Sequence, residues 1–144
     1  MMPREVIAFQ WLMNHLNVPY KWGGDNPLEG LDCSGLVNEF HKSLGMVARD
    51  FDATAQVLHS IHKKQHTQKL KDCVFGDLVF YGRSEKDITH VGICLDDLLM
   101  LEAGGGGSRT INRQRAEEQG AWVRMRPIQT RKDIVGFGRP NYPW

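Results

Sequence analysis

The sequence has few cysteines and almost no excess charge. Its three cysteines, Cys33, Cys73 and Cys94, cannot all pair within the chain, and none stands in a C-x-x-C spacing. This pattern excludes a disulfide framework and a zinc ribbon, and it leaves at least one thiol free. The formal net charge of +1 provides no overall field that would draw the chain to nucleic acid or to an anionic membrane. We therefore expect neither as a partner.

Long apolar segments are also missing. No run approaches the ~18 residues that a membrane-spanning helix needs, and the N-terminus lacks the apolar core of a signal peptide. We expect a monomer that is made in the cytoplasm without a signal peptide and does not insert into a membrane. The length of 144 residues and the hydrophobic share of 41% predict one folded domain over residues 1–144 rather than a disordered chain.

The small net charge hides an asymmetry. Residues 1–108 carry ten basic and fourteen acidic side chains, whereas residues 109–144 carry eight basic and three acidic ones. The segment from Arg109 to Arg139 is therefore locally basic. Two interpretations stay open for it: a solvated surface, or the border of a site for an anionic ligand.

The spacing of apolar residues changes from helical to strand-like along the chain. Helical spacing predicts helices over residues 3–16, from Asp32 to about residue 44, and over 53–64, with Asp52 as the N-cap of the third. Short β-rich segments separated by turn residues follow. They cover residues 78–81, 88–95, 98–103, 122–128 and 134–137. Helices first and strands second predict an α+β fold with a C-terminal antiparallel sheet.

Cys33 lies where the second helix is predicted to begin. Unpaired N–H groups and the positive end of the helix dipole favour the thiolate, which is the nucleophilic form of cysteine, at such a position. A buried structural cysteine is the common alternative. That alternative fits Cys94, inside a predicted strand, and Cys73, just before one, better than it fits Cys33.

His90 and Glu102 lie on consecutive predicted strands, twelve residues apart. This even separation puts both side chains on one face of a hairpin if the connection near Asp96 and Asp97 has three residues, and on opposite faces if it has two. In the first case the carboxylate can orient the imidazole while the other ring nitrogen faces Cys33, as in covalent acyl transfer. Taken alone, His90 is more simply interpreted as a hydrogen-bonded structural histidine.

Three further histidines, His59, His62 and His66, follow a helical spacing. Because no carboxylate or cysteine stands at ligand spacing, they predict a polar helix face beside Lys63 and Lys64 rather than a metal site. We expect no metal and no other cofactor.

Four consecutive glycines, residues 104–107, follow the strand that ends near Glu102. No Gly-Lys-Ser/Thr accompanies them, so they predict no phosphate-binding loop. They are interpreted as a flexible turn, or as the mobile rim of a cleft.

Four short motifs follow one another along the chain. They are Pro19-Tyr20-Lys21-Trp22-Gly23-Gly24, Asp32-Cys33-Ser34-Gly35-Leu36-Val37, Gly76-Asp77-Leu78-Val79-Phe80 and Thr89-His90-Val91-Gly92-Ile93. In order and spacing they resemble the NlpC family of papain-like cell-wall cysteine peptidases, from the first predicted helix to about Ala103. One such motif is a weak signal, whereas four in sequence are a specific one.

The resemblance implies a papain-like NlpC fold, with N-terminal helices packed on the antiparallel sheet, and a catalytic set. Cys33 is then the nucleophile, His90 is the general base and afterwards the general acid, and Glu102 stands at the position of the third polar residue. Many relatives have His at that position, so Glu102 is a departure. A carboxylate can also orient the imidazole, and it favours the protonated ring more than a neutral His would.

The resemblance also assigns three residues to substrate binding. Tyr20 matches a tyrosine whose hydroxyl lies near the nucleophile, and Asp32 and Ser34 match residues that shape the substrate subsite. Each has a structural alternative: a core aromatic for Tyr20, a helix N-cap for Asp32 and a first-turn residue for Ser34.

The reaction that the resemblance implies is hydrolysis of an amide bond in the stem peptide of bacterial peptidoglycan, most often the bond from γ-D-glutamate to the diamino acid, through a thioester. The chain would act on the cell wall by phage lysis, tail delivery or another non-Sec route, or on wall fragments in the cytoplasm. Two alternatives stay open. One is a structural or delivery component of a phage tail or secretion apparatus, with secondary or lost hydrolase activity, and the other is an enzyme of the same fold that acts on another amide or on a lipid acyl group.

Overall fold

The computed structural model describes residues 3–63 and 69–144 of the chain. The chain divides into two compact units. The first unit comprises Met1–Asp52, Ala103–Arg124 and Asn141–Trp144, and the second comprises Ala53–Glu102 and Met125–Pro140. Each unit is therefore built from segments that are far apart in the sequence.

Five strands form one sheet in the order β6-β5-β4-β3-β7. The strands are β3 (Leu78–Ser84), β4 (Asp87–Cys94), β5 (Leu99–Gly104), β6 (Trp122–Pro127) and β7 (Ile134–Gly138). β3 pairs antiparallel with both β4 and β7, and β4 pairs antiparallel with β5. The first five residues of β3 are all buried, so both faces of this strand are covered over that stretch.

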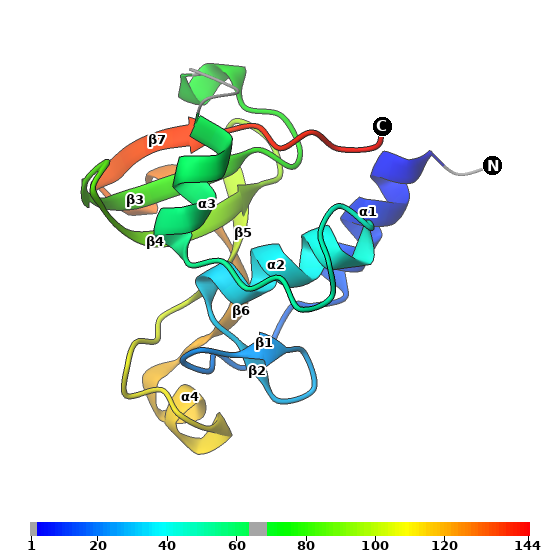
Figure 1. Ribbon diagram of the computed structural model, residues 1–144. Helices are drawn as coiled ribbons and strands as arrows, with labels where there is room; N and C mark the ends of the chain where they lie inside the picture. The colour runs from blue at the N-terminus through cyan, green and yellow to red at the C-terminus, as the bar shows by residue number, and fades with distance from the viewer. Residues whose placement is uncertain (1–2, 64–68) are drawn as a thin grey trace. The chain divides into compact units, whose positions relative to one another are not determined.

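In the second unit, α3 (Ala55–His62) lies across β3 and β4, as Figure 1 shows. The His59 ring meets the Phe80 ring edge-on, with 5.1 Å between the centroids, and the Gln56 side chain accepts a hydrogen bond from the Ile88 N–H at 2.9 Å. Residues that alternate with Phe80 along β3 point to the opposite face. There a buried cluster comprises Cys73, Val79, Tyr81, Cys94, Met100 and Ile128.

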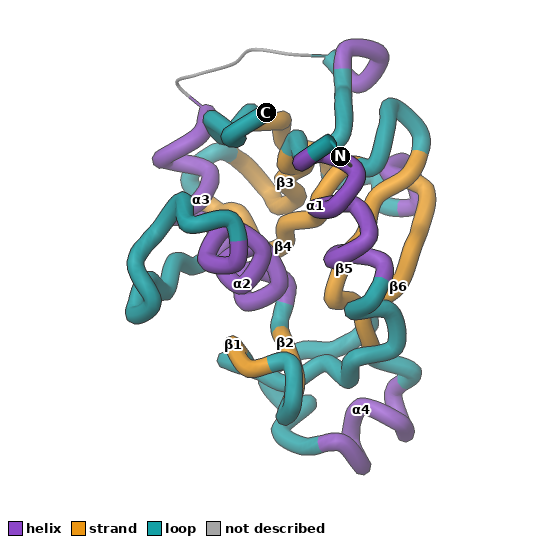
Figure 2. Tube along the Cα trace, turned by 90° about the vertical axis from the view of Figure 1, so that its right-hand side faces the viewer, coloured by secondary structure: helices purple, strands orange, loops and turns teal. Residues whose placement is uncertain are grey.

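The first unit contains three helices and a short two-stranded ladder among its described residues. They are α1 (Arg4–Met13), β1 (Asp25–Asn26), β2 (Gly30–Leu31), α2 (Cys33–Ser43) and α4 (Arg113–Gln119). α1 and α2 contact each other through Trp11 and Phe40, whose ring centroids are 5.7 Å apart. β2 leads directly into α2 (Figure 2), so the antiparallel pairing of β1 with β2 holds the chain just before the helix begins.

The α+β class, the antiparallel sheet and the five predicted strands are confirmed. The observed ends of the first helix and the start of the third differ from the predicted ones. The first helix ends at Met13 rather than near residue 16, because a turn follows in which Asn17 adopts a φ of 71°. The third begins at Ala55, and its N-cap is Thr54 rather than Asp52, since the Thr54 hydroxyl accepts from the Val57 N–H at 3.2 Å. Its predicted end at residue 64 lies outside the described residues.

Sequence reasoning missed α4 and the β1–β2 ladder. α4 has an ordinary start and end: the Asn112 side chain accepts from the Arg115 N–H at 2.9 Å, and Gly120 ends the helix with a φ of 62°. Its only buried residue is Ala116. The sequence of α4 therefore has no helical repeat of apolar residues, and only the two cap residues could have indicated this helix.

In the described part of the chain, no helix combines the length and the hydrophobicity needed to cross a bilayer.

Candidate active site

Cys33 is the first residue of α2, and Asp32 caps the start of this helix. The Asp32 carboxylate accepts from the Gly35 N–H at 2.7 Å, and the Asp32 carbonyl accepts from the Leu36 N–H at 3.1 Å. The N–H groups of Cys33 and Ser34 have no partner within the helix. Cys33 is only partly buried. A thiol and two backbone donors therefore lie together at the positive end of the helix dipole.

Further hydrogen bonds hold the Asp32 carboxylate in place. It accepts from the Gly23 N–H at 3.0 Å and from the Ser34 hydroxyl at 3.3 Å. Burial raises the pKa of Asp32, and the hydrogen bonds from Gly35, Gly23 and Ser34 oppose that shift. Gly35 must lack a side chain, because a Cβ there would lie 2.0 Å from the Gly24 carbonyl oxygen. The expected N-cap role of Asp32 is confirmed.

Tyr20 belongs to the same cluster. Its side chain is buried, and its pKa is raised first by burial and then by the negative charges of Cys33 and Asp32. The hydroxyl therefore stays protonated near neutral pH and can donate a hydrogen bond. Gly106 makes room for the ring, since a Cβ on Gly106 would lie 2.4 Å from Tyr20 Cδ1.

The glycine run is a packed and hydrogen-bonded turn. Gly104 ends β5, and Gly105 adopts a φ of 84°. The Gly107 N–H donates to the Thr110 hydroxyl at 2.9 Å, and the Thr110 N–H donates back to the Gly107 carbonyl at 2.9 Å. Thr110 is fully buried and also donates to the Gln119 side chain at 2.5 Å. These contacts favour a packing role over the mobile rim expected from the sequence.

His90 and Glu102 meet in the second unit. The register pairs Ile93 with Leu101, and the Leu95 N–H donates to the Leu99 carbonyl at 2.8 Å, so three residues, 96–98, lie between the last opposed pair of the hairpin. The three-residue connection is confirmed, and it places both side chains on one face of the hairpin. His90 Nε2 lies 2.7 Å from Glu102 Oε1. An ionised Glu102 can only accept, and in that state it places the hydrogen on Nε2 of His90.

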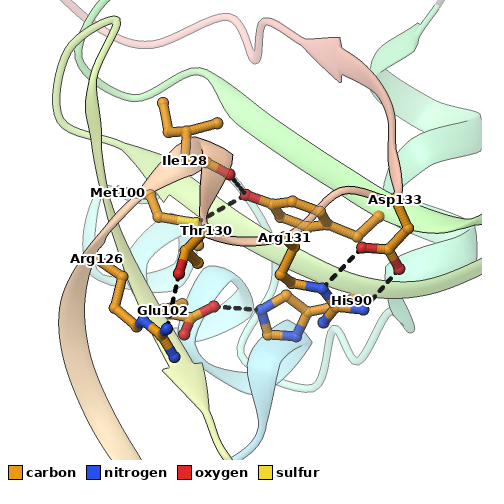
Figure 3. A network of polar contacts seen from close by, with 9 residues as sticks. His90, Met100, Glu102, Arg126, Ile128, Thr130, Arg131 and Asp133 are labelled. Carbon is orange, nitrogen blue, oxygen red and sulfur yellow. Dashed lines mark hydrogen bonds and ion pairs between the residues drawn. The ribbon is translucent and has the colours of Figure 1, made fainter.

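The His90–Glu102 pair is buried, with 7% and 2% of the two residues exposed, and it lies within a larger polar network (Figure 3). The Tyr81 ring lies next to the imidazole, with 5.6 Å between the centroids. The Tyr81 hydroxyl donates to the Ile128 carbonyl at 2.7 Å. This hydrogen bond ties the aromatic neighbour of His90 to the segment that follows β6.

The six candidate residues form two groups. Four lie in the first unit and two in the second. The first group contains a thiol, backbone N–H groups at a helix start, a carboxylate and a phenol. The second group contains an imidazole and a carboxylate in contact with it. These are the kinds of group that covalent acyl transfer requires.

All six residues lie within residues 17–126, the stretch that matches the sequence profile of the NlpC/P60 family. The match covers well over half of the chain. The chain belongs to the NlpC/P60 family.

Two curated relatives are similar over most of this chain. The bifunctional muramidase/DL-endopeptidase CwlT of Bacillus subtilis is 36% identical over 84% of this chain, which is 32% of CwlT. The murein DD-endopeptidase MepH of Escherichia coli is 29% identical over 89% of this chain and 47% of MepH. The chain thus spans between about a third and about half of the length of these curated relatives.

A solved NlpC/P60 structure shares the fold. RipD of Mycobacterium tuberculosis superposes with a TM-score of 0.68 at 15% identity, covering 97% of this chain and 98% of that one. RipD is described as a non-catalytic NlpC/P60 domain protein adapted to peptidoglycan binding. Fold similarity at this identity carries no statement about activity.

Sequence reasoning missed three residues around the histidine: Tyr81, Arg131 and Asp133. Tyr81 follows the Gly76–Phe80 motif directly and looked like an ordinary strand residue. Arg131 and Asp133 lie in the basic segment and pair with each other at 2.8 Å. No local pattern links them to His90, since about forty residues separate them along the chain.

The histidines of α3 do not form a polar face. His59 is 3% exposed and His62 is 8% exposed, and burial lowers the pKa of both. The prediction of a polar helix face beside Lys63 and Lys64 is wrong for these two residues, because both are buried. His66 lies outside the described residues. Within residues 3–63 and 69–144, no three or more His, Cys, Asp or Glu side chains gather in a way that could hold a metal ion.

The other two cysteines are buried, as the structural alternative predicted. Cys73 is 6% exposed and Cys94 is fully buried. The pKa of Cys94 is raised well above its usual value, first by the contact with the Cys73 thiol and then by burial. A thiol held in its protonated form is a poor nucleophile.

Several basic side chains of the C-terminal segment have acidic partners. The ion pairs are Arg113–Glu117, Arg115–Glu118, Arg131–Asp133 and Arg139–Asp77. The two pairs of α4 are largely exposed. On α4 the structure therefore favours the solvated surface over a border for an anionic ligand.

Proposed function

We propose that this NlpC/P60 chain is a cysteine peptidase that hydrolyses an amide bond in the stem peptide of bacterial peptidoglycan, with residues 1–144 acting as one catalytic domain. The observation that carries the proposal is the buried contact of 2.7 Å between His90 and Glu102. Burying two ionisable groups is costly, and a base with its orienting carboxylate is the arrangement that covalent acyl transfer needs. The endopeptidase names of CwlT and MepH support the substrate class.

Cys33 is the proposed nucleophile. Since Nε2 of His90 is engaged by Glu102, we assign Nδ1 to take the thiol proton. The thiolate then attacks the amide carbonyl, and the carbonyl π electrons move onto oxygen. In this mechanism the N–H groups of Cys33 and Ser34 at the start of α2 donate to that oxyanion.

The tetrahedral intermediate collapses when protonated His90 gives its proton to the leaving amine and the C–N bond breaks. A thioester on Cys33 remains. A water molecule, deprotonated by His90, attacks the thioester, and the C–S bond breaks to release the acid and restore the thiolate. Glu102 keeps the ring oriented and stabilises the positive charge that the imidazole carries in each cycle.

Tyr20, Asp32 and Ser34 form the proposed substrate subsite. The Tyr20 hydroxyl stays protonated and can donate to the reacting group, while the Asp32 carboxylate can accept from an N–H or ammonium group of the stem peptide. The target bond we favour joins γ-D-glutamate to the diamino acid. The DL-endopeptidase name of CwlT supports that bond, whereas the DD-endopeptidase name of MepH supports a different one.

Digestion of defined muropeptides tests the proposal. The purified full chain is incubated with fragments that offer either a DL or a DD bond, and mass spectrometry identifies the new amine. Cys33→Ala should abolish cleavage, and Arg83→Gln, at a side chain that is 89% exposed, is the matched control. Absence of cleavage by the wild-type chain, or equal cleavage by Cys33→Ala, would contradict the peptidase.

The site of action that we propose is the bacterial wall or its fragments. The alternative role is a structural or delivery component of a phage tail or secretion apparatus, in which hydrolysis is secondary or lost. A particle that carries Cys33→Ala and still assembles and infects normally would support that alternative.

A further inference from the structure

Tyr81 occupies an irregular point of the sheet. It stands directly opposite His90 on β4 and opposite Ile134 on β7. The register shifts on both sides of it, between Tyr81 and Gly82 against β4 and between Phe80 and Tyr81 against β7. Such bulges re-aim side chains and are frequent beside active sites. The sheet is therefore distorted at the residue that neighbours His90.

The Tyr81 side chain is fully buried and held at its far end. Its hydroxyl donates to the Ile128 carbonyl at 2.7 Å and lies 3.2 Å from the Met100 sulfur. Figure 3 shows these contacts on one side of the network and the imidazole of His90 on the other. With its hydroxyl anchored, the ring has little freedom to move away from His90.

Arg131 covers the Tyr81 ring. Its Cζ atom lies 4.9 Å from the ring centroid, a cation–π distance. Asp133 fixes the guanidinium through two hydrogen bonds, Nε to Oδ1 at 3.0 Å and Nη2 to Oδ2 at 2.8 Å. A paired guanidinium on an aromatic face is a pre-organised geometry that Lys does not reproduce.

We propose that Arg131 and Asp133 are positioning residues for the His90–Glu102 pair. They act through the Tyr81 ring, which contacts Arg131 and lies next to the His90 imidazole. The proposal deepens the proposed function, because it concerns the histidine of the same site. Neither residue has to touch the substrate in this role. Arg131 holds the ring in place, and the ion pair sets the electric field at the imidazole.

The charges alternate in sign around His90. Asp133 has a lowered pKa, first because Arg131 bonds to it and in part because of the positive charge that His90 carries when its ring is protonated. Arg131 has a raised pKa, first because of Asp133 and in part because of Glu102 and Tyr81. Each charge therefore stabilises the opposite charge of the other pair, and removing one leaves an imbalance at the imidazole.

The titratable and charged groups drawn around the imidazole in Figure 3 include Glu102 on β5, Tyr81 on β3, and Arg131 with Asp133 before β7, and Arg126 of β6 lies on the Glu102 side of the network. α3 lies on the opposite face, where His59 meets Phe80. Cys33 is the further titratable group that the proposed mechanism brings to this ring.

NMR titration of the His90 ring in the full chain tests the proposal without any hydrolysis, so its failure is distinguishable from failure of the peptidase. Arg131→Gln should raise the His90 pKa by about half a unit to one unit, because the charges of Asp133 and Glu102 then lack compensation. Asp133→Asn should lower it by a similar amount. The double variant, which keeps the net charge, should return close to the wild-type value.

Shifts of the His90 pKa in opposite directions in the two single variants are the decisive result, because loss of structure alone would not produce them. Arg83→Gln removes an arginine whose side chain is 89% exposed and pairs with Asp87 rather than with Tyr81 or Asp133, and it should leave the titration unchanged. Shifts of the same sign, or none, in variants with wild-type thermal unfolding would overturn the proposal.

Kinetics on the muropeptide substrate provide the second measurement. We expect Arg131→Gln to lower kcat about tenfold with KM within about twofold, and Arg131→Lys to restore part of the loss by restoring the charge. A rise in KM with unchanged kcat would assign Arg131 to substrate binding and contradict the positioning role.

Discussion

His90 and Glu102 stand twelve residues apart in the sequence, yet Nε2 of one lies 2.7 Å from Oε1 of the other. The contact follows from the three-residue turn between Leu95 and Leu99, which places both side chains on one face of the hairpin. A carboxylate thus stands where the resemblance to the family more often implies a second histidine. An acidic partner holds a full negative charge against the imidazole and stabilises the ring when it is protonated.

Replacing Glu102 by Gln should lower kcat by at least about tenfold, because the amide retains a hydrogen-bonding oxygen but loses the charge that stabilises the imidazolium. Steady-state kinetics on a defined muropeptide measure the effect. Glu102→His, which introduces the residue of many relatives, should recover part of the rate. An unchanged rate in Glu102→Gln would reduce Glu102 to a structural carboxylate at the end of a strand.

Cys33 should react with iodoacetamide at least about tenfold faster than Cys73 or Cys94 near neutral pH. Cys33 is partly exposed at a helix start, whereas the other two are buried and the Cys94 thiol is held protonated. Timed alkylation followed by peptide mapping gives the three rates in one sample. If Cys33 proved the slowest of the three, the nucleophile assignment would have to be abandoned.

Gly106→Ala and Gly107→Ala form a matched pair. A Cβ on Gly106 would meet the Tyr20 ring at 2.4 Å, whereas a Cβ on Gly107 meets nothing within 4 Å. We expect Gly106→Ala to reduce the free energy of unfolding by about 1–3 kcal/mol and to lower activity by displacing Tyr20. Gly107→Ala should stay within about 0.5 kcal/mol of the wild type. Equal effects of the two substitutions, measured by urea unfolding, would show that the close approach to Tyr20 is unimportant.

Stability should decrease as pH falls through about 6.5, the ordinary pKa of histidine. Burial lowers the pKa of His59 and His62 in the folded chain. Below that pH the unfolded chain binds protons that the native state does not, so the free energy of unfolding drops. The double variant His59→Gln, His62→Gln should show a flatter dependence between pH 7 and pH 5 in thermal unfolding. A dependence as steep as that of the wild type would rule out these two groups as its source.

Local rules were sufficient for the helix that carries the thiol. An Asp before Cys-Ser-Gly predicted an N-cap and a helix start, and both are present because the Asp32 side chain bonds to a donor only three residues away. The prediction of the third helix was less accurate at its start. Thr54 and Asp52 are both good caps, and the choice between them depends on how the helix packs.

The sequence also predicts which residues of a strand share a face, but for two strands of a hairpin this prediction depends on the length of the turn between them. A three-residue turn places His90 and Glu102 on the same face, and a two-residue turn places them on opposite faces. The register of β4 with β5 corresponds to the three-residue turn. The inward turn of His59 and His62 shows the same limit, because a helical period does not say which face meets the sheet.

Short-range chemistry therefore determined that this chain has a capped helix with a thiol at its start, a strand with a histidine and four motifs of one family. Tertiary pairing determined the surroundings of that histidine. Tyr81, Arg131 and Asp133 come from segments about fifty residues apart, and they meet because β3 pairs with β4 on one side and with β7 on the other. Contacts of that range depend on register and bulges, which no residue specifies alone.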